Sequence, residues 1–454
     1  MFRLPKDTKI TETILDDFLS KHQLEVNSRY SKLENAYLSQ HDILNANKKE
    51  EWKPDNRIVV NFPKYIVDVT NGFFIGNPVK VTATDPAVTE YVNYLNKYNG
   101  QDDSNAEIAK ICGIFGKGFV FNYANEYSEL CTAYFTPKEA FIIYDDTIAK
   151  NKLFWVRVYE DNDKNKFGYI CDKTSERNFS ITGGVKWIDE WKTHGFAEVP
   201  AVEFVENEER QGVFEPVLTM VNAYNKAISE KANDNDAFSD AYMKIIGSKV
   251  DEDTAKFIRN NRIINIYNTD GDDSNIIVDF MAKPSNDAGQ EHLLDRLERH
   301  IFQIGQSADV SDENFGTTSG IAMLYKMWAT SNKGKTKERK FTSSLDQLYR
   351  ILFSHPLSKV PADAWLQLEY KFTPNIPANL LEETQIATNL EGITSHKTQL
   401  KALSIVQNVE DELEAIEEEN KPDESLTNKI LGFGDNEESS AAEETQREKI
   451  KEGV

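Results

Sequence analysis

The clearest apolar pattern in the chain lies between Asn56 and Val81. Residues 57–60 have the composition of a strand. Asn61 offers a side-chain cap for a following helix, and Pro63 suits the first helical turn, where a missing N–H costs no hydrogen bond. Apolar residues then recur every three or four positions, at Phe62, Ile66, Val69 and Phe73. With residues 79–83 as a second strand, the stretch predicts a strand–helix–strand core unit.

The remaining pattern predicts an α+β fold. The first 45 residues show helical spacing, whereas residues 57–204 contain short strand-like runs separated by turn signals. Because these runs follow one another without an intervening helical pattern, we expect a meander. Residues 321–353 predict a long helix with a kink or weak point at Gly334. Residues 379–419 predict two further helices.

Two segments, residues 212–240 and 290–308, have helical periodicity but few apolar positions. Their apolar residues form one stripe on each helix, at Val221, Tyr224 and Ile228 and at Leu297, Ile301 and Ile304. A helix this polar cannot pack along its whole length on the core of its own subunit. We therefore expect both helices to pack beside neighbouring copies of the chain through these residues.

The composition is strongly acidic. Charged residues make up 28% of the 454 residues, apolar residues 39%, and the formal net charge is −23. Residues 408–454 hold 16 acidic and 5 basic residues, a balance of −11, and the part after residue 420 is expected to be disordered. Because affinity for duplex DNA comes largely from cations that displace counterions, this charge argues against tight DNA binding. It remains compatible with a protein that DNA passes without sticking.

One segment has the opposite charge. Residues 326–340 carry 6 Lys or Arg against 1 Glu, a balance of +5. This run is either a solvated helix face or a weak, repeated contact with phosphate. The candidates for such a contact are Lys333, Lys335 and Lys337.

Motifs for catalysis and ligand binding are incomplete. Residues 113–118, GIFGKG, lack the leading Gly and the final Ser or Thr of a phosphate loop, and are better explained as a turn between strands. Residues 316–320, GTTSG, have Thr in place of the nucleophilic Ser. His292 and His300 are too far apart on one helix to share a metal. We therefore predict no enzyme, no cofactor and no metal site.

The sequence also predicts no membrane association. The apolar run 56–81 is interrupted by polar residues and falls short of the roughly 20 apolar residues that a span requires. The first residues lack the pattern of a secretion signal. The three cysteines form no C-x-x-C pair, which favours a reduced setting over a disulfide scaffold.

An ordered series of motifs resembles the portal proteins of tailed bacteriophages, in the branch found in long-tailed phages of Gram-positive bacteria. The series is NFPKYIVDVTNGFFIGNPV, GKGFVFNY, PKEAFIIYDD, the run from VPAVEFVENEERQ to DAFSDAYM, SDENFGTTSGIAMLYKM and EGITSHKTQLKAL. Each motif alone is unspecific, but the unbroken order covers roughly residues 40–420.

The resemblance implies a homo-oligomeric ring, usually of twelve subunits, at one vertex of the capsid. Double-stranded DNA would be packaged and ejected through its central channel. The implied partners are the terminase large subunit, the head–tail connector, and the major capsid and scaffold proteins. The implied location is the virion, with assembly in the host cytoplasm.

The resemblance also implies a division of the chain. The parts are an N-terminal helical segment (1–45), a wing (46–210), a first stem helix (211–241), a clip (242–285), a second stem helix (286–308), a tunnel loop (309–320), a long helix with a returning wing strand (321–378), a helical crown (379–420) and an acidic tail (421–454).

The tunnel loop is the part that the resemblance brings nearest to DNA. Its expected channel residues are Asp312, Glu313, Asn314, Thr317, Thr318 and Ser319. The neutral residues can touch a phosphate backbone without an ionic grip, and the two acids repel it.

Two other functions remain open from the sequence. One is a phage head–tail structural or adaptor protein without a channel, which would lack two stem helices flanking a clip. The other is a DNA-processing enzyme, which magnesium-dependent nuclease or ATPase turnover would reveal.

Overall fold

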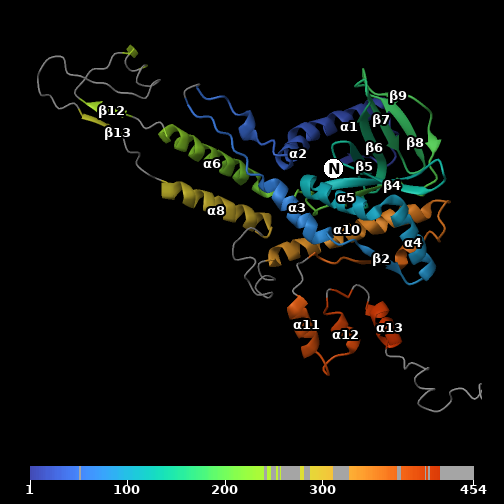
Figure 1. The fold of residues 1–454 in the computed structure, drawn as a ribbon. Coiled ribbons are helices and arrows are strands. Elements are labelled where there is room, and N and C mark those ends of the chain that lie inside the picture. Colours follow the sequence, from blue (N-terminus) through green and yellow to red (C-terminus); the bar gives the residue numbers. More distant parts are fainter. Residues whose placement is uncertain are drawn as a thin grey trace, which may run out of the picture. The chain divides into compact units, whose positions relative to one another are not determined.

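The computed structural model describes residues 1–50, 53–239, 243–246, 252–253, 256, 277–280, 287–309, 327–375, 380–403, 405–406 and 409–419. The chain forms two compact units, Met1–Asn375 and Ile376–Val454. Helices and strands are mixed throughout the first unit, so the α+β prediction is confirmed (Figure 1).

The largest sheet has seven strands. They are β1 (Phe2–Leu4), β5 (Ala140–Asp145), β6 (Lys152–Glu160), β7 (Lys166–Cys171), β8 (Ser175–Ser180), β9 (Lys186–Trp187) and β10 (Lys192–Thr193). Strands β5 to β8 pair antiparallel in chain order, which confirms the predicted meander. Strand β1 pairs parallel with β5 and was not predicted, because three residues are too short to show a pattern.

The two faces of this sheet pack on different layers, because side chains alternate along a strand. Phe141 and Val156 face a cluster that includes Leu15 and Phe18 of helix α1 (Glu12–Glu25). On the other face, Trp155 packs in a separate cluster with residues of a three-stranded sheet. That sheet has the order β11 (Ala201–Val205), β3 (Lys117–Ala124), β4 (Leu130–Phe135).

Helices form the largest core together with the three-stranded sheet. They are α2 (Ser31–Tyr37), α3 (Phe62–Ile75), α4 (Pro86–Asn99), α5 (Gln101–Phe115), α6 (Leu218–Ser239), α8 (Asp287–Gly305) and α10 (Trp328–Ser354). Phe341 of α10 lies at the centre of this core, with ring centroids 5.5 Å from Phe74 and 4.9 Å from Phe204. Helix α10 therefore joins the helical layer to the sheet.

Short elements complete the first unit. They are a π-helical turn (Val26–Tyr30), 3-10 helices (Asp42–Asn45, Glu215–Val217 and Ala364–Gln367), a two-stranded sheet of β2 (Lys80–Ala83) and β14 (Leu368–Lys371), and a second one of β12 (Met243–Ile246) and β13 (Ile277–Phe280). The second unit contains α11 (Leu380–Asn389), α12 (His396–Leu400) and α13 (Val409–Glu419), three helices where two were predicted.

The strand–helix–strand prediction for residues 56–81 is partly correct. Asn61 caps α3 by accepting a hydrogen bond from the Lys64 amide, and Pro63 lies in the first turn. Strand β2 follows as predicted. Residues 57–60 are extended but belong to no sheet.

The GIFGKG motif ends a helix rather than joining two strands, so this prediction was wrong. Gly116 terminates α5 with a φ of +84°, and β3 starts at the next residue. A Cβ on Gly116 would lie 2.0 Å from the Arg210 carbonyl oxygen. Glycine therefore permits both the turn and a close contact between backbones.

Helix α10 continues through Gly334 without interruption. A Cβ at Gly334 would lie 3.0 Å from a ring atom of Phe73 in α3. The glycine thus permits close packing between α10 and α3.

Candidate functional site: the helix pair and its strap

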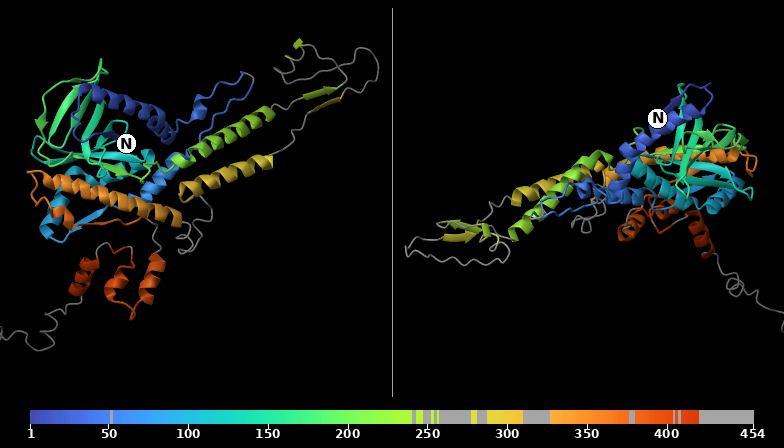
Figure 2. Two further views of the ribbon diagram at one scale, coloured as in Figure 1. Left: turned by 180° about the vertical axis from the view of Figure 1, so that it is seen from behind. Right: turned by 90° about the horizontal axis from the view of Figure 1, so that it is seen from above.

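Helices α6 and α8 lie side by side in every view (Figure 1 and Figure 2). Lys231 of α6 forms an ion pair with Glu291 of α8. Nearer the core, Phe62 of α3 contacts both helices, with ring centroids 5.0 Å from Tyr224 and 5.7 Å from Phe302. Both helices therefore pack on α3, and an ion pair links one helix to the other.

The predicted stripe residues mostly face the interior of their own subunit. Val221 and Ile301 have no exposed surface and Tyr224 is 9% exposed, all within the largest core cluster. Ile228 and Leu297 are half-buried against the same cluster. The structure thus contradicts packing of Val221, Tyr224 and Ile301 on another copy, because residues of the same chain cover them.

One residue of the predicted set remains available to a neighbour. Ile304 is 50% exposed, as is Leu293 on the same helix. Both lie on α8 beside the buried Leu294 and Ile301, which face the core. Packing of Ile304 on a neighbouring copy stays a prediction.

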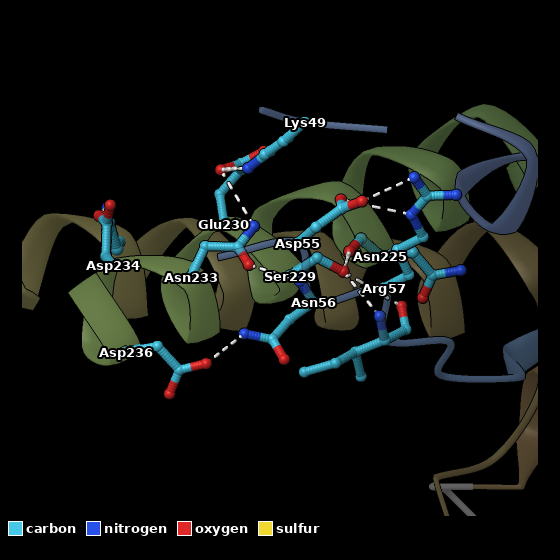
Figure 3. A network of polar contacts seen from close by, with 12 residues as sticks. Lys49, Asp55, Asn56, Arg57, Asn225, Ser229, Glu230, Asn233, Asp234 and Asp236 are labelled. Carbon is cyan, nitrogen blue, oxygen red and sulfur yellow. Dashed lines mark hydrogen bonds and ion pairs between the residues drawn. The ribbon is translucent and has the colours of Figure 1, made fainter. Parts of the chain in front are cut away.

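Three buried polar residues, Asn225, Ser229 and Asn233, follow one another every four positions along α6. We call them the polar ladder, and residues 55–60 the strap. Asn233 accepts a hydrogen bond from the Asn56 amide (2.6 Å), Ser229 from the Ile58 amide (2.9 Å) and Asn225 from the Val60 amide (2.9 Å). Figure 3 shows Asp55, Asn56 and Arg57 of the strap beside the three ladder residues of α6.

The bonding pattern follows from two matching repeats. Four residues of an α-helix advance about 6 Å, since each rises about 1.5 Å. Two residues of an extended chain advance about 6.6 Å, and their amides point to the same side. Alternate strap amides therefore meet successive ladder residues, in antiparallel direction.

Charged and polar groups around the ladder form further contacts between α6 and the segment that contains the strap. Lys49 forms an ion pair with Glu230 of α6 at 2.8 Å, and this hydrogen-bonded partner lowers the pKa of the Glu230 carboxyl. The Asn56 side chain donates to Asp236 at 2.5 Å. On the strap itself, Arg57 pairs with Asp55 at 2.8 Å.

The ladder accounts for part of the polarity of α6. That polarity predicted that the helix packs beside neighbouring copies of the chain. Three of its polar side chains are instead buried against the strap of the same chain. The detectable signal was the spacing of Asn225, Ser229 and Asn233, together with a strand-like segment that has no strand partner.

Two of the lysines of α10, Lys333 and Lys337, are held inside the subunit. Lys337 is 4% exposed, forms an ion pair with Glu206 at 2.7 Å and donates to the Ala109 carbonyl at 2.9 Å. Lys333 donates to the carbonyl of Gly305, the last residue of α8, at 2.9 Å. Burial lowers the pKa of the Lys333 ammonium to about 8.

These positions revise the predicted phosphate contact. Lys333 and Lys337 hold α10 against α8, α5 and Glu206, which follows β11, so neither ammonium is presented to a phosphate backbone. Lys335 is exposed, and a contact there stays a prediction. Among the described cations of the basic run, these two lysines are held inside the subunit, whereas Lys335 and Arg339 are exposed.

The expected channel residues Asp312, Glu313, Asn314, Thr317, Thr318 and Ser319 lie outside the described residues. Among the residues that are described, no group of three or more His, Cys, Asp or Glu could hold a metal ion. No helix in this part of the chain is long and apolar enough to cross a membrane. Cys112, Cys131 and Cys171 are free and buried.

Comparison with known proteins places the chain in a family. The model of the family described as phage portal protein, SPP1 Gp6-like, matches residues 16–425. The chain therefore belongs to this family of bacteriophage portal proteins, as its motifs suggested.

Two relatives of the chain are named portal proteins. The portal protein of Bacillus phage SPP1 is 23% identical over 447 residues, which cover 91% of this chain and 86% of that protein. The portal protein of Clostridium phage phiCD119 is 26% identical over 231 residues, and the match spans half of each chain. A chain in the neck of an empty GTA particle has a TM-score of 0.41 and 13% identity, covering 74% of this chain and 88% of that one.

The ladder predicts a local effect of losing one acceptor. Ser229→Ala removes the partner of the Ile58 amide, a loss worth about 1.4 kcal/mol or a tenfold change in an opening equilibrium. Hydrogen exchange at Ile58 should accelerate by about that factor. Lys226→Ala, at an exposed position on the same helix, should leave it unchanged. Equal exchange in both variants would show that the ladder does not hold the strap.

The buried ion pair on α10 predicts a global effect. Lys337→Met leaves the Glu206 carboxylate buried without its cation, which should lower the free energy of unfolding by about 3–5 kcal/mol. The double variant Lys337→Met/Glu206→Leu should recover most of the loss, and Lys335→Met should change it by less than about 0.5 kcal/mol. Chemical denaturation measures the free energy of unfolding of all three variants. An unchanged value for Lys337→Met would contradict a stabilising role of the ion pair.

Proposed function

We propose that this chain is the subunit of a ring at one capsid vertex, through which double-stranded DNA is packaged and ejected. Its family membership over residues 16–425 carries this proposal. The terminase large subunit and the head–tail connector dock on the ring in turn, and capsid and scaffold proteins surround it. In this proposal the chain has no catalytic role.

The proposed parts can be matched to described elements. The wing contains the two larger sheets and α3 to α5, and α6 and α8 are the stem. Of the clip, the structure describes β12 and β13, which pair antiparallel from Met243↔Phe280 to Ile246↔Ile277. The crown contains α11 to α13. The hairpin and the two stem helices distinguish this proposal from a simple adaptor.

Exposed apolar residues on α8 support assembly with other copies. Leu293 and Ile304 are each half exposed on a helix whose other apolar residues are covered by their own chain. A closed ring uses two different surfaces of each subunit, so a stem helix has one flank on its own core and one on a neighbour. Burial by a neighbour would remove these two side chains from water.

The charge of the chain supports passage of DNA without retention. The net charge of −23 opposes counterion release on a phosphate backbone. Lys333 and Lys337, two cations of the basic run, are engaged within the subunit. A channel wall of this kind holds DNA in no deep energy minimum along its length.

Residues 317–319 are the proposed point of closest approach to DNA. This role rests on the resemblance of SDENFGTTSG to the tunnel loop of portal proteins. Short hydroxyl side chains form hydrogen bonds worth about 0.5–1.5 kcal/mol each, which thermal motion can break and remake.

Two substitutions on one helix separate assembly from folding. Ile304→Asp should leave the subunit folded but prevent ring formation, because Ile304 is half exposed. Ile301→Asp should instead unfold the subunit, at a cost of at least about 3 kcal/mol, because it buries a charge without a partner.

Thermal unfolding and light scattering measure these two effects. Leu366→Asp, at a 69% exposed position away from the helix pair, is the control and should affect neither. Rings of normal size from Ile304→Asp would refute the role of α8 in assembly. Monomers from the unmodified protein at micromolar concentration, seen by negative-stain imaging, would refute the ring itself.

Deletion of residues 317–319 tests the channel role. We expect rings of normal size and a marked fall in the number of DNA-filled heads in a packaging assay, because the proposed DNA-facing loop is shortened. Ring size is the control within the same preparation. A wild-type yield of DNA-filled heads would show that packaging does not need residues 317–319.

A further inference from the structure

A cleft of about 750 Å³ lies between the three-stranded sheet and the meander. Strands β3 and β4 form one wall, and β6, β7 and β8 form the other. Its lining is rich in aromatic side chains, among them Phe121, Phe135, Trp155, Tyr159 and Tyr169. A cleft of this size and composition is typical of ligand sites.

Three buried hydrogen-bond donors on residues that line this cleft have no partner among the described residues. They are the Nε1 of Trp155, the Nε of Arg157 and the Nδ2 of Asn122, whose Oδ1 is unbonded too. Trp155 is 1% exposed, and its ring stacks on Phe121 at a centroid distance of 4.2 Å. An unpaired buried donor is unfavourable. The two donors on β6, Trp155 and Arg157, lie on one face of the strand and indicate a place for acceptors that another molecule provides.

Arg157 is held in a geometry suited to recognition. Its guanidinium lies over the rings of Phe135 and Tyr159, at 4.8 Å and 5.1 Å from their centroids. The Arg157 side chain forms no ion pair or hydrogen bond with any described residue. The rings fix the plane of the cation and leave its charge without a carboxylate.

We propose that this cleft binds an extended peptide segment of a partner protein. Trp155 and Arg157 are alternate residues of β6, so their backbones lie about 6.6 Å apart on one face. Alternate carbonyl oxygens of an extended peptide repeat at about the same distance. Two of them, or a carbonyl and a carboxylate, accept from the two donors. The apolar side chains of the peptide pack against the aromatic walls.

The charges of the cleft favour a peptide over a single-stranded nucleic acid, which also stacks on aromatic rings. Glu176 lines the same cleft, where its carboxylate accepts a hydrogen bond from Tyr169 and would repel phosphate. Tyr123 and Tyr159 are 40% and 39% exposed and also line the cleft. Amphipathic tyrosines of this kind are frequent at protein interfaces.

This site goes beyond the proposed channel function and does not depend on it. It lies on the sheets rather than on the helix pair. Loss of peptide binding with normal rings would leave the ring proposal intact, and the reverse also holds.

A library of short random peptides, displayed on beads and sorted against the purified full-length protein, tests the proposal. We expect enriched sequences that bind the wild-type protein. The variants Arg157→Met and Tyr159→Ala should each weaken the enriched peptides by about tenfold or more, or about 1.4 kcal/mol. Lys166→Met, which removes an exposed cation at the start of β7, is the matched control and should bind normally.

Three results would overturn the proposal. They are the absence of any enriched peptide, equal binding of enriched peptides to wild type and both variants, and Arg157-dependent binding of an oligothymidylate in their place. Tyr159 is partly exposed, so its variant keeps the test valid even if Arg157→Met fails to fold. Circular dichroism of each variant monitors folding.

Discussion

Helix α6 is joined to residues 55–60 by a simple requirement: backbone amides shielded from water must have hydrogen-bond partners. The strap is extended but has no neighbouring strand, so its amides at positions 56, 58 and 60 bind side chains of α6. This places α6 against the strap. Because Asn61 directly follows the strap and caps α3, the orientation of α6 is linked to the first turn of α3.

The distribution of charge follows a related logic. The chain is strongly acidic, yet Lys333 and Lys337 of its most basic segment point inward to carbonyls and a carboxylate. Lys333 lies at the C-terminal end of α8, where the helix dipole favours a cation. These two cations thus hold the long helix α10 in the subunit.

Local signals in the sequence predicted much of the fold, and contacts between distant segments account for the rest. Asn61 and Pro63 start α3 as predicted, and the meander has its expected strands. Helices α4 and α5 were not predicted, although Asp85 with Pro86 and the αL residue Gly100 mark their ends.

The ladder was missed because its partners, residues 56–60, lie more than 160 positions away. The contacts of Tyr224 and Phe302 with Phe62 of α3 likewise join distant segments, which periodicity alone cannot identify.

The antiparallel arrangement of strap and ladder has a mechanical consequence. The bonds lie across the direction of the strap, as ladder bonds lie across paired strands (Figure 3). A force that slides the strap along α6 loads all three at once, in shear. A force that peels the strap away breaks them one after another. The joint therefore resists axial tension on α6 far better than it resists lateral peeling.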